Sequence, residues 1–522
     1  MEAQTVAQKS SRPPGAERPP HLRAGELWTA ARRSPFLTAA LACVVLAALS
    51  AAVLPTVPSY DPWAWIVWGR EVVDPHLSFT VGGGPSWKPL PVIFTTVFAL
   101  FGGAAPTLWV IAARAGGLLG LVAASRLAAR LVGDRRWAVV AGILAAAGVV
   151  LTQDWVYYMF RGATEPMLIG TSLWAVDRFL SGRRGSAFAL GVATCLMRPE
   201  AWPLLGAYAI WLWVREPRLR VLVIAGLLAI PFFWFVPPWI GSGQPFLAAS
   251  HAREYNGHLG SDPFLEVLRR GVDLQVLPAL IAAGVAAAIA LVSVRRPSSP
   301  DRDPDALGRD RLTLWLAALT LAWWVIVVGM TLDGYPGLER FYLPAAALTC
   351  VLAGVGIARV ARLAGGALGS RAAPIRVGAA WVPAAVAAAL IALSIPFTTA
   401  RISTARAQEP IASRAVTRLD QLSAAVAAVG GHRRVYPCHS SFTAVNHSVQ
   451  TALAWKLHVT LGRVGTSMRH QGLMFIGPHD SIDGGVPRVD HRLTQMRLLA
   501  MAGVWRVYRM TSPGSDTRCV GR

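Results

Sequence analysis

Charged residues are scarce in this chain. Of its 522 residues, 54% are hydrophobic and 15% are Asp, Glu, Lys or Arg, whereas about a quarter of a typical soluble domain is charged. The apolar residues occur in blocks of about 20, which is the length of helix that crosses a bilayer. The sequence therefore predicts an integral membrane protein.

Long runs of like charge are missing too, although the formal net charge is +22. The basic residues are scattered between the apolar blocks, and they form no basic arm of the kind that binds nucleic acid. They stand instead where they would orient membrane helices and contact anionic headgroups. We expect membrane lipids among the partners, and no nucleic acid.

Cysteine is rare, with five residues in the chain. Cys43, Cys195 and Cys350 fall inside apolar blocks, where we expect them to pack as small hydrophobic residues. Cys438 and Cys519 lie in the polar C-terminal part, where an oxidising compartment would permit a disulfide; two free thiols are the open alternative. The seven histidines of that part show no common zinc-ligand spacing, so no zinc site is predicted there.

Eleven apolar blocks follow one another along the chain. They lie near 36–54, 106–125, 136–152, 166–180, 186–198, 201–214, 219–237, 274–294, 312–330, 339–359 and 377–398. The blocks at 186–198 and 201–214 are short and are interrupted by Pro199 and Pro203, so they form either two spans or one broken span. We predict about eleven transmembrane helices.

Arginine-rich segments alternate with arginine-poor segments between these blocks, and this alternation predicts the topology. The arginines are Arg32, Arg33, Arg126, Arg130, Arg135, Arg136, Arg183, Arg184, Arg215, Arg218, Arg220, Arg295, Arg296, Arg302, Arg309, Arg311, Arg359, Arg362, Arg371 and Arg376. By the positive-inside rule their loops are cytoplasmic. We expect a multi-pass plasma-membrane protein with its N-terminus inside and its C-terminus outside. The first outer loop, 55–105, then shares the outer face with 153–165, 238–273 and 331–340.

Composition divides the chain into three parts. Residues 1–35 are rich in Pro, Arg and Ser, and they predict a disordered cytoplasmic tail. Residues 36–398 form the transmembrane domain. Residues 401–522 alternate helical patterns such as "LDQLSAAVAAV" with strand-like runs such as "GVWRVYRM", which predicts a small α/β domain outside the membrane. The predicted fold class is an all-α polytopic membrane protein with this C-terminal domain.

Carboxylates cluster directly after the first apolar block, in "SYDPWAWIVWGREVVDPHL". Asp61 follows the block closely and is flanked by Pro62 and Trp63, and partial burial raises the pKa of a carboxyl group toward the range of a general base. Glu71 and Asp74 lie farther along, where a solvated loop anchored by tryptophans explains them better. Substrate contact by Glu71 is the alternative.

A second acidic group lies in "LTQDWVYYMFRGATEP", at the predicted outer end of the third span. Asp154 precedes a tryptophan, and Glu165 opens the next span directly before Pro166. An acid at a helix N-terminus is also favoured by the helix dipole alone, and both explanations can hold for Glu165. Asp61, Asp154 and Glu165 are all expected at the outer membrane surface.

Basic side chains are predicted on the same face. They are Lys88 in "PSWKPLP", Arg161 in "FRGATEP", Arg198 in "MRPEAW" and Arg340 in "GYPGLERFYLPA". Fixed cations stabilise the negative charge that a departing phosphate gains; the alternative for each is a side chain that reaches toward lipid headgroups. His251 and His258, in "SHAREYNGH", either contact substrate or belong to a solvated loop.

The order of these segments resembles that of the GT-C glycosyltransferases. The acid after the first span, the segment "WKPLPVIFTTVFALFGGAAPTLWVIAARAGG", the opening "ATEPMLIGTSLWAVDRFL" and the late "GLERFYLPAAALTCVLAGVGI" are similar to the corresponding family segments. "LMRPEAWPLLGAYAIWLW" is similar to actinobacterial members. The resemblance covers residues 36–398. It implies an outward-facing active site in a helical bundle, and transfer of a sugar from a polyprenyl-phosphate donor to an acceptor outside.

The resemblance also implies roles for individual residues. Asp61 would be the base, Asp154 the second acid and Glu165 a supporting acid. Lys88 and Arg340 would bind the donor phosphate, with Arg161 and Arg198 as further candidates. Mannose or arabinofuranose on decaprenyl phosphate is the implied donor, and an envelope glycan or glycolipid the acceptor. The need for a divalent metal stays open, because branches of the family differ.

The chain departs from the family pattern in two ways. Asp61 is followed by Pro62 where some branches have an adjacent acid pair, and the C-terminal part has no tryptophan-rich acceptor motif, which argues against a protein acceptor. A transporter or lipid flippase is the main rival function. Such proteins place polar groups near the midplane on broken helices, whereas the predicted spans here have apolar middles. A non-catalytic envelope scaffold is a third alternative.

Overall fold

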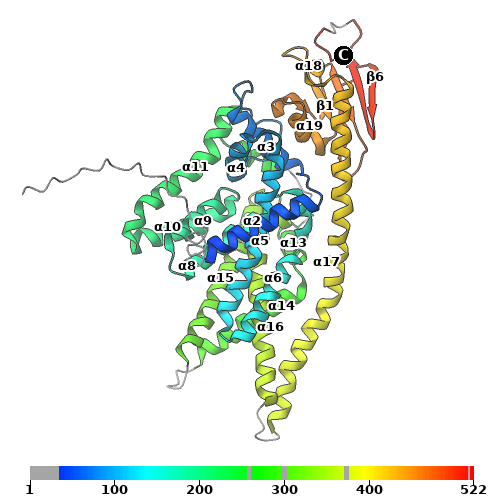
Figure 1. The fold of residues 1–522 in the computed structure, drawn as a ribbon. Helices are drawn as coiled ribbons and strands as arrows, with labels where there is room; N and C mark the ends of the chain where they lie inside the picture. The colour runs from blue at the N-terminus through cyan, green and yellow to red at the C-terminus, as the bar shows by residue number, and fades with distance from the viewer. Residues whose placement is uncertain are drawn as a thin grey trace, which may run out of the picture.

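The computed structural model describes residues 35–254, 260, 262–296, 303–369, 375–514 and 518–521. All of the predicted tail except its last residue lies outside these ranges, and so does His258. The described chain forms a bundle of helices with a small sheet-containing domain at one end (Figure 1). This arrangement confirms the predicted fold class.

The bundle is built from helices of very different lengths. In chain order the helices are α2 (Pro35–Val53), α3 (Tyr60–Val73), α4 (Pro89–Ala99), α5 (Ala105–Val132), α6 (Arg135–Val150), α7 (Trp155–Arg161), α8 (Glu165–Leu180), α9 (Arg184–Cys195), α10 (Trp202–Arg215), α11 (Arg220–Ser242), α12 (Leu247–Glu254), α13 (Pro263–Asp273), α14 (Leu277–Arg295), α15 (Pro304–Leu332), α16 (Leu343–Gly369) and α17 (Ile375–Ala428). Two short 3-10 helices matter for the site: η2 (Pro199–Ala201) and η4 (Glu339–Tyr342).

Within the described residues, seven helical segments are long and apolar enough to cross a bilayer, and the bent pair α6 and α7 would make an eighth. The segments are Phe36–Val53, Gly102–Val132, Pro217–Ser242, Leu277–Arg295, Pro304–Leu332, Glu339–Ala364 and Ala388–Ala428. The protein is therefore a multi-pass membrane protein. Each of the eleven predicted blocks falls largely within a helix, but α8, α9 and α10 have only 16, 12 and 14 residues. These three helices are too short to be identified as membrane spans by length, so the number of eleven spans stays a prediction.

Small residues allow close packing at the centre of the bundle. The segment Glu339–Ala364, which contains most of α16, is 94% buried in its most apolar window. A Cβ atom added at Gly354 would lie 2.4 Å from the carbonyl oxygen of Ala141, and one at Gly356 would lie 2.1 Å from that of Ala282. Backbones approach this closely only where side chains are absent, which is typical of membrane helix interfaces. The glycines of "LAGVGI" thus bring α6 and α14 onto α16.

The interrupted pair 186–214 forms two antiparallel helices. The hydroxyl of Tyr208 on α10 donates to the carbonyl of Arg184 at the start of α9 (3.0 Å). At the other end, the indole of Trp202 donates to the carbonyl of Cys195 (3.2 Å). The two helices therefore lie side by side with η2 as their tip, and this tip carries Arg198 and Glu200.

The C-terminal domain, from the end of α17 to residue 521, contains a five-stranded sheet of order β2-β1-β4-β7-β6. The strands are β1 (Thr443–Val445), β2 (Val464–Gly465), β4 (Gly472–Ile476), β6 (Gln495–Ala502) and β7 (Trp505–Thr511), with α18 (Gly431–Val435) and α19 (Gln450–Lys456) beside them; β3 (Ser467–Met468) and β5 (Arg488–Val489) form a separate pair. β1 runs parallel to β2 and β4, whereas β7 is antiparallel to both of its neighbours. The domain boundary predicted near residue 400 falls inside α17, whose 54 residues join the bundle and the domain without a loop (Figure 1).

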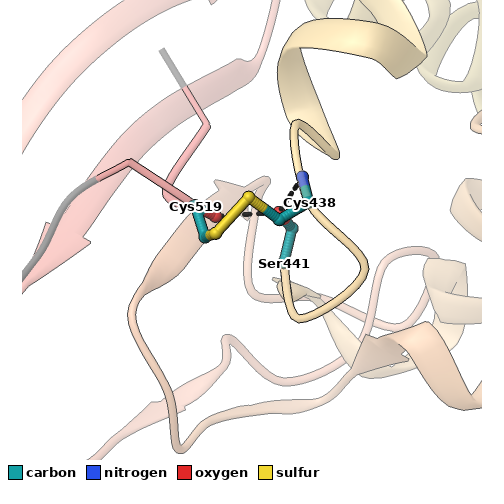
Figure 2. Close-up of a disulfide and its surroundings, with 3 residues drawn as sticks. All are labelled: Cys438, Ser441 and Cys519. Atoms are coloured by element: carbon teal, nitrogen blue, oxygen red, sulfur yellow. Dashed lines mark hydrogen bonds between the residues drawn. A yellow bond between two sulfur atoms is a disulfide. The ribbon is translucent and has the colours of Figure 1, made fainter.

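Cys438 and Cys519 form a disulfide, with their Cα atoms 5.1 Å apart (Figure 2). The hydroxyl of Ser441 donates to the carbonyl of Cys519 (2.8 Å) and accepts from the amide of Cys438 (3.1 Å). The bond ties the chain terminus to the segment before β1. Cys43, Cys195 and Cys350 are free and buried, as their places in apolar blocks predicted.

Replacing both Cys438 and Cys519 with serine is expected to lower the unfolding free energy of the C-terminal domain by about 2–5 kcal/mol. The bond joins residues 81 apart in sequence, so its loss gives the unfolded domain much more conformational freedom. Limited proteolysis at rising temperature, on protein in lipid nanodiscs, measures the effect. Reduced wild-type protein serves as the matched control and should behave like the double variant. A double variant as resistant as the oxidised wild type would contradict the prediction.

Candidate functional site

A pocket of about 940 Å3 lies where the bundle meets the C-terminal domain. Its walls come from the start of α3, the segment before α4, η2, α12, η4 and the turn after β1. Five of the residues singled out in the sequence line it: Asp61, Lys88, Arg198, His251 and Arg340. Segments that are far apart in the chain thus bring a carboxylate, a histidine and three cations together.

Two of the cations are held by a buried carboxylate. Glu165, in the first turn of α8, is 2% exposed. Its Oε1 lies 2.8 Å from Nη2 of Arg198 and 3.9 Å from Nζ of Lys88. Lys88 also donates to the hydroxyl of Thr164 (3.0 Å). Glu165 is not among the residues that line the pocket, so this placement makes it a positioning group for two cations.

The backbone around Lys88 fixes where its amine points. Lys88 is extended (φ −133°, ψ 117°) and precedes Pro89 at the start of α4, as expected because proline disfavours helical geometry in the residue before it. The indole of Trp87 donates to the carbonyl of Phe233 (2.9 Å). The amide of Leu90 donates to the carbonyl of Leu196 (3.1 Å), two residues before Arg198. Lys88 and Arg198 are therefore joined through backbone as well as through Glu165.

Burial, together with the neighbouring charges of Arg198 and Arg340, lowers the pKa of Lys88 to about 8, although Glu165 and Asp61 oppose the shift. The effect has a simple cause. An ammonium group taken out of water beside other cations loses solvation and gains repulsion. Lys88 is thus poised to change charge near neutral pH.

Arg340 is positioned by the packing of η4 against its neighbours. The indole of Trp323 on α15 donates to the carbonyl of Phe341 (2.8 Å). The guanidinium of Arg198 lies over the ring of Phe341, 4.7 Å from its centroid. These contacts set η4 against η2 and bring Arg340 to the same pocket as Arg198.

Asp61 is half-buried in the first turn of α3. The turn is anchored on both sides: the amide of Trp63 donates to the carbonyl of Ser59, and the amide of Ser59 donates to the carbonyl of Arg161, both at 3.0 Å. The carboxylate is near enough to Lys88 to affect its charge. A carboxylate and a set of cations thus line the same pocket.

Besides Glu165, three predicted site residues in the described part of the chain do not line this pocket. Asp154 lies in the break between α6 and α7, with a left-handed backbone (φ 59°) and an exposed side chain; its charge interacts with Arg401 and with Glu339 at the pocket. Arg161 bonds to Tyr157 and interacts with Asp483 of the C-terminal domain. These positions place Asp154 and Arg161 beside the pocket rather than in it.

Glu71, the third, joins the two domains. Its Oε2 accepts from the amide of Thr80 and its Oε1 from the amide of Leu461, both at 2.9 Å. Burial raises the pKa of Glu71 to about 7, although these bonds oppose the shift. The side chain is 3% exposed. This placement favours a structural role over the substrate contact that the sequence left as an alternative.

Further bonds reinforce this joint. The guanidinium of the adjacent Arg70 donates to the carbonyls of Trp455 (2.9 Å), Ala454 (3.2 Å) and Val459 (2.8 Å). Nε2 of His458 lies 2.8 Å from Oδ2 of Asp74. Asp74, assigned to a solvated loop from the sequence, therefore also helps to dock α19 onto α3.

The pocket also contains residues that the sequence did not reveal. They are Tyr60, Tyr158, Glu200, Glu254, Glu339 and His447. Glu200 is 2% exposed and its Oε1 lies 3.8 Å from Nη1 of Arg198. Glu200 and Glu339 stand close in sequence to recognised cations, a signal that could have found them. His447 carries no such signal.

In the described part of the chain, no group of three or more His, Cys, Asp or Glu side chains is arranged to hold a metal ion. The sequence left open whether a divalent metal is needed, and the structure does not change this. A metal held jointly by the protein and a substrate phosphate would leave no such group.

A second cavity, of about 440 Å3, lies next to the pocket between α8, α9, α10, α15 and α16. Its lining is mainly apolar and includes Leu173, Phe179, Trp211, Trp315, Leu319 and Leu348. Ala201 of η2 lines this cavity, while the preceding Glu200 lines the polar pocket. A single short turn thus separates a charged space from an apolar one.

No model of a known protein family matches the sequence, and no curated protein matches it. Solved structures do match. The crystal structure of ArnT from Cupriavidus metallidurans bound to undecaprenyl phosphate has a TM-score of 0.53 at 15% identity, covering 93% of this chain and 98% of that one. The apo structure of that protein has a TM-score of 0.49 at 14% identity, over the same shares. The archaeal oligosaccharyltransferase AglB from Archaeoglobus fulgidus has a TM-score of 0.39 at 14% identity, covering 84% and 66%. The predicted GT-C-like fold is confirmed as a fold.

Proposed function

We propose that the chain is a membrane glycosyltransferase that moves a sugar from a polyprenyl-phosphate donor to an envelope glycan or glycolipid outside the cytoplasm. The observation that carries the proposal is the meeting of Lys88, Arg198 and Arg340 with Asp61 in one pocket. Three cations in a confined space suit a phosphate group, and a neighbouring carboxylate suits proton removal. The first match in fold was crystallised with undecaprenyl phosphate, which agrees with this chemistry.

The apolar cavity supports a lipid-linked donor in particular. It borders the cationic pocket across η2, a neighbourhood that suits a molecule with a phosphate head and a hydrocarbon chain. Burying the chain against aromatic and aliphatic side chains contributes about 25 cal/mol per Å2 of apolar surface. A soluble nucleotide sugar would leave the apolar cavity unused.

The proposed reaction is a single displacement. The Asp61 carboxylate accepts the proton of an acceptor hydroxyl while that oxygen attacks the anomeric carbon of the donor sugar. The bond between that carbon and the phosphate oxygen breaks, and the leaving oxygen keeps the electron pair. Lys88, Arg198 and Arg340 stabilise the second negative charge that the phosphate gains. Attack opposite the leaving group inverts the sugar, and Asp61 later releases its proton to water.

Glu165 takes a positioning role in this proposal. By pairing with Lys88 and Arg198 it holds both cations in place before the substrate binds, so little reorganisation is needed during the reaction. Asp154 and Arg161 lie beside the pocket, where they act on Glu339 and on the C-terminal domain. The proposed location is the plasma membrane, with the N-terminus cytoplasmic and the pocket outside.

The proposal is tested with the full chain in lipid nanodiscs, supplied with decaprenyl-phosphoryl mannose or arabinofuranose and short mannosyl or arabinofuranosyl oligosaccharides. Release of decaprenyl phosphate and growth of the oligosaccharide are the expected results. Arg198→Gln and Arg161→Gln form a matched pair. The first is expected to lower turnover by about 10²-fold or more, and the second to leave it within a few-fold because Arg161 does not line the pocket.

A gene deletion separates the proposal from its rival. Deletion should remove one residue type or linkage from the envelope glycans, as read by mass and linkage analysis. An unchanged glycan profile together with lipid transport by the purified protein would overturn the glycosyltransferase and favour a flippase.

A further inference from the structure

The C-terminal domain contributes a residue to the pocket of the bundle. His447 begins the short turn η5 (His447–Val449) between β1 and α19. Of the described residues that line the pocket, it is the one that belongs to this domain. Its side chain is exposed, and its ring stacks on that of Tyr60, with centroids 4.9 Å apart and an angle of 23° between the planes. The two domains therefore build one aromatic surface together.

Hydrogen bonds to the C-terminal domain hold the Tyr60 member of this ring pair. The hydroxyl of Tyr60 donates to Oε1 of Gln450 (2.9 Å), and Nε2 of Gln450 donates to the carbonyls of Gly83 (2.9 Å) and Val464 (2.6 Å). The hydroxyl of Thr451 donates to the carbonyl of Tyr60 (2.9 Å). Tyr60 is thus fixed before any ligand arrives, which lowers the entropy lost on binding.

The ring pair stands next to the proposed base. Tyr60 directly precedes Asp61 at the start of α3, and both line the pocket. The three cations come from other elements, namely the start of α4, the segment before η2, and η4. The pocket therefore has a cationic part supplied by the bundle and an aromatic part completed by the C-terminal domain. Asp61 adjoins the aromatic part, and its charge acts on Lys88 in the cationic part.

We propose that His447 and Tyr60 bind the acceptor, and that the acceptor is a neutral, hydroxyl-rich glycan. The inference rests on the proposed function and deepens it. Flat aromatic faces bury the C–H faces of sugar rings, and the imidazole nitrogens can donate to and accept from sugar hydroxyls. A glycan seated on this pair presents a hydroxyl to the neighbouring Asp61, while the donor phosphate occupies the cations. The C-terminal domain thereby selects the acceptor.

The test compares three variants of the full chain in nanodiscs, with decaprenyl-phosphoryl donors and short arabinofuranosyl or mannosyl oligosaccharides as acceptors. His447→Ala should raise the KM for the oligosaccharide roughly tenfold, the size of one lost aromatic contact. His447→Phe keeps a flat ring and should recover most of that loss. His491→Ala is the control, because His491 has a 91% exposed side chain in the same domain and does not line the pocket. Binding of sugar-free decaprenyl phosphate should be the same in all three.

Each other outcome overturns the inference in a recognisable way. If the wild type is active and His447→Ala leaves the KM for the oligosaccharide unchanged, the acceptor site is rejected but the proposed function is not. Equal weakening of donor and acceptor binding indicates a general structural role. Transfer to a Ser/Thr-rich peptide that depends on His447, with none to oligosaccharides, rejects the glycan class. A wild type inactive with every donor rejects the proposed function and this inference with it.

Discussion

Asp61→Asn is expected to lower the rate of sugar transfer by about 10²–10⁴-fold, the range of a positioned general base. Asparagine has nearly the same size and shape as aspartate, but it cannot accept a proton from an attacking hydroxyl. The side chain lines the pocket at the start of α3, so the substitution removes a negative charge near the donor phosphate. Binding of decaprenyl phosphate should therefore be kept or become tighter while turnover is lost.

Single-turnover kinetics on nanodisc-embedded protein separate these two effects. Asp333→Asn is the matched control, because Asp333 has a 69% exposed side chain at the end of α15 and does not line the pocket. Resistance to limited proteolysis shows that both variants are folded. A folded Asp61→Asn protein that works at the wild-type rate would remove Asp61 from the mechanism.

Lys88→Ala is expected to lower kcat by about 10²–10³-fold, as loss of one preorganised donor to a developing anion does. The pH dependence gives a sharper test of the same group. The pKa of Lys88 is lowered to about 8, so the amine is charged below pH 8 and neutral above it. Wild-type activity should therefore fall as the pH rises through about 8, because the neutral amine no longer stabilises the phosphate.

Lys88→Arg distinguishes this cause from other alkaline effects. A guanidinium stays charged throughout the range of the assay, so the fall at high pH should move upward or vanish even if the absolute rate is lower. A profile of kcat/KM against pH, at saturating acceptor, measures it. The same alkaline limb in Lys88→Arg as in the wild type would assign that limb to another group.

The sequence predicted how deep the site residues lie in the membrane, but not the direction in which their side chains point. Asp61, Lys88, Arg198 and Arg340 stand out because each is a charged group near or between apolar blocks on the same predicted face, and all four line the pocket. Position along a span fixes the depth of a residue in the membrane but leaves open which way its side chain points around the helix axis. Asp154 has a suitable depth, but it has a left-handed backbone and does not line the pocket.

Sequence patterns did not predict which segments far apart in the chain contact one another. Glu71 bonds to Leu461, which lies 390 residues away, and no periodicity in either segment indicates the partner. His447 is similarly far along the chain from Tyr60, and its spacing to the other histidines gives no sign that its ring stacks on a tyrosine. Glu165 was predicted as an acid at a helix N-terminus, but its two cationic partners come from separate loops.

The docking of α19 onto α3 constrains how the chain threads the bilayer. Because Arg70 donates to the backbone of Ala454, Trp455 and Val459, the first loop and the C-terminal domain occupy one aqueous compartment, whatever the charge of other loops suggests. A path that leaves a compartment and returns to it must cross the membrane an even number of times. If each of the other predicted blocks after the first loop crosses once, the antiparallel pair α9 and α10 satisfies this parity as two crossings or as none. A single broken crossing would then place the C-terminal domain on the opposite side.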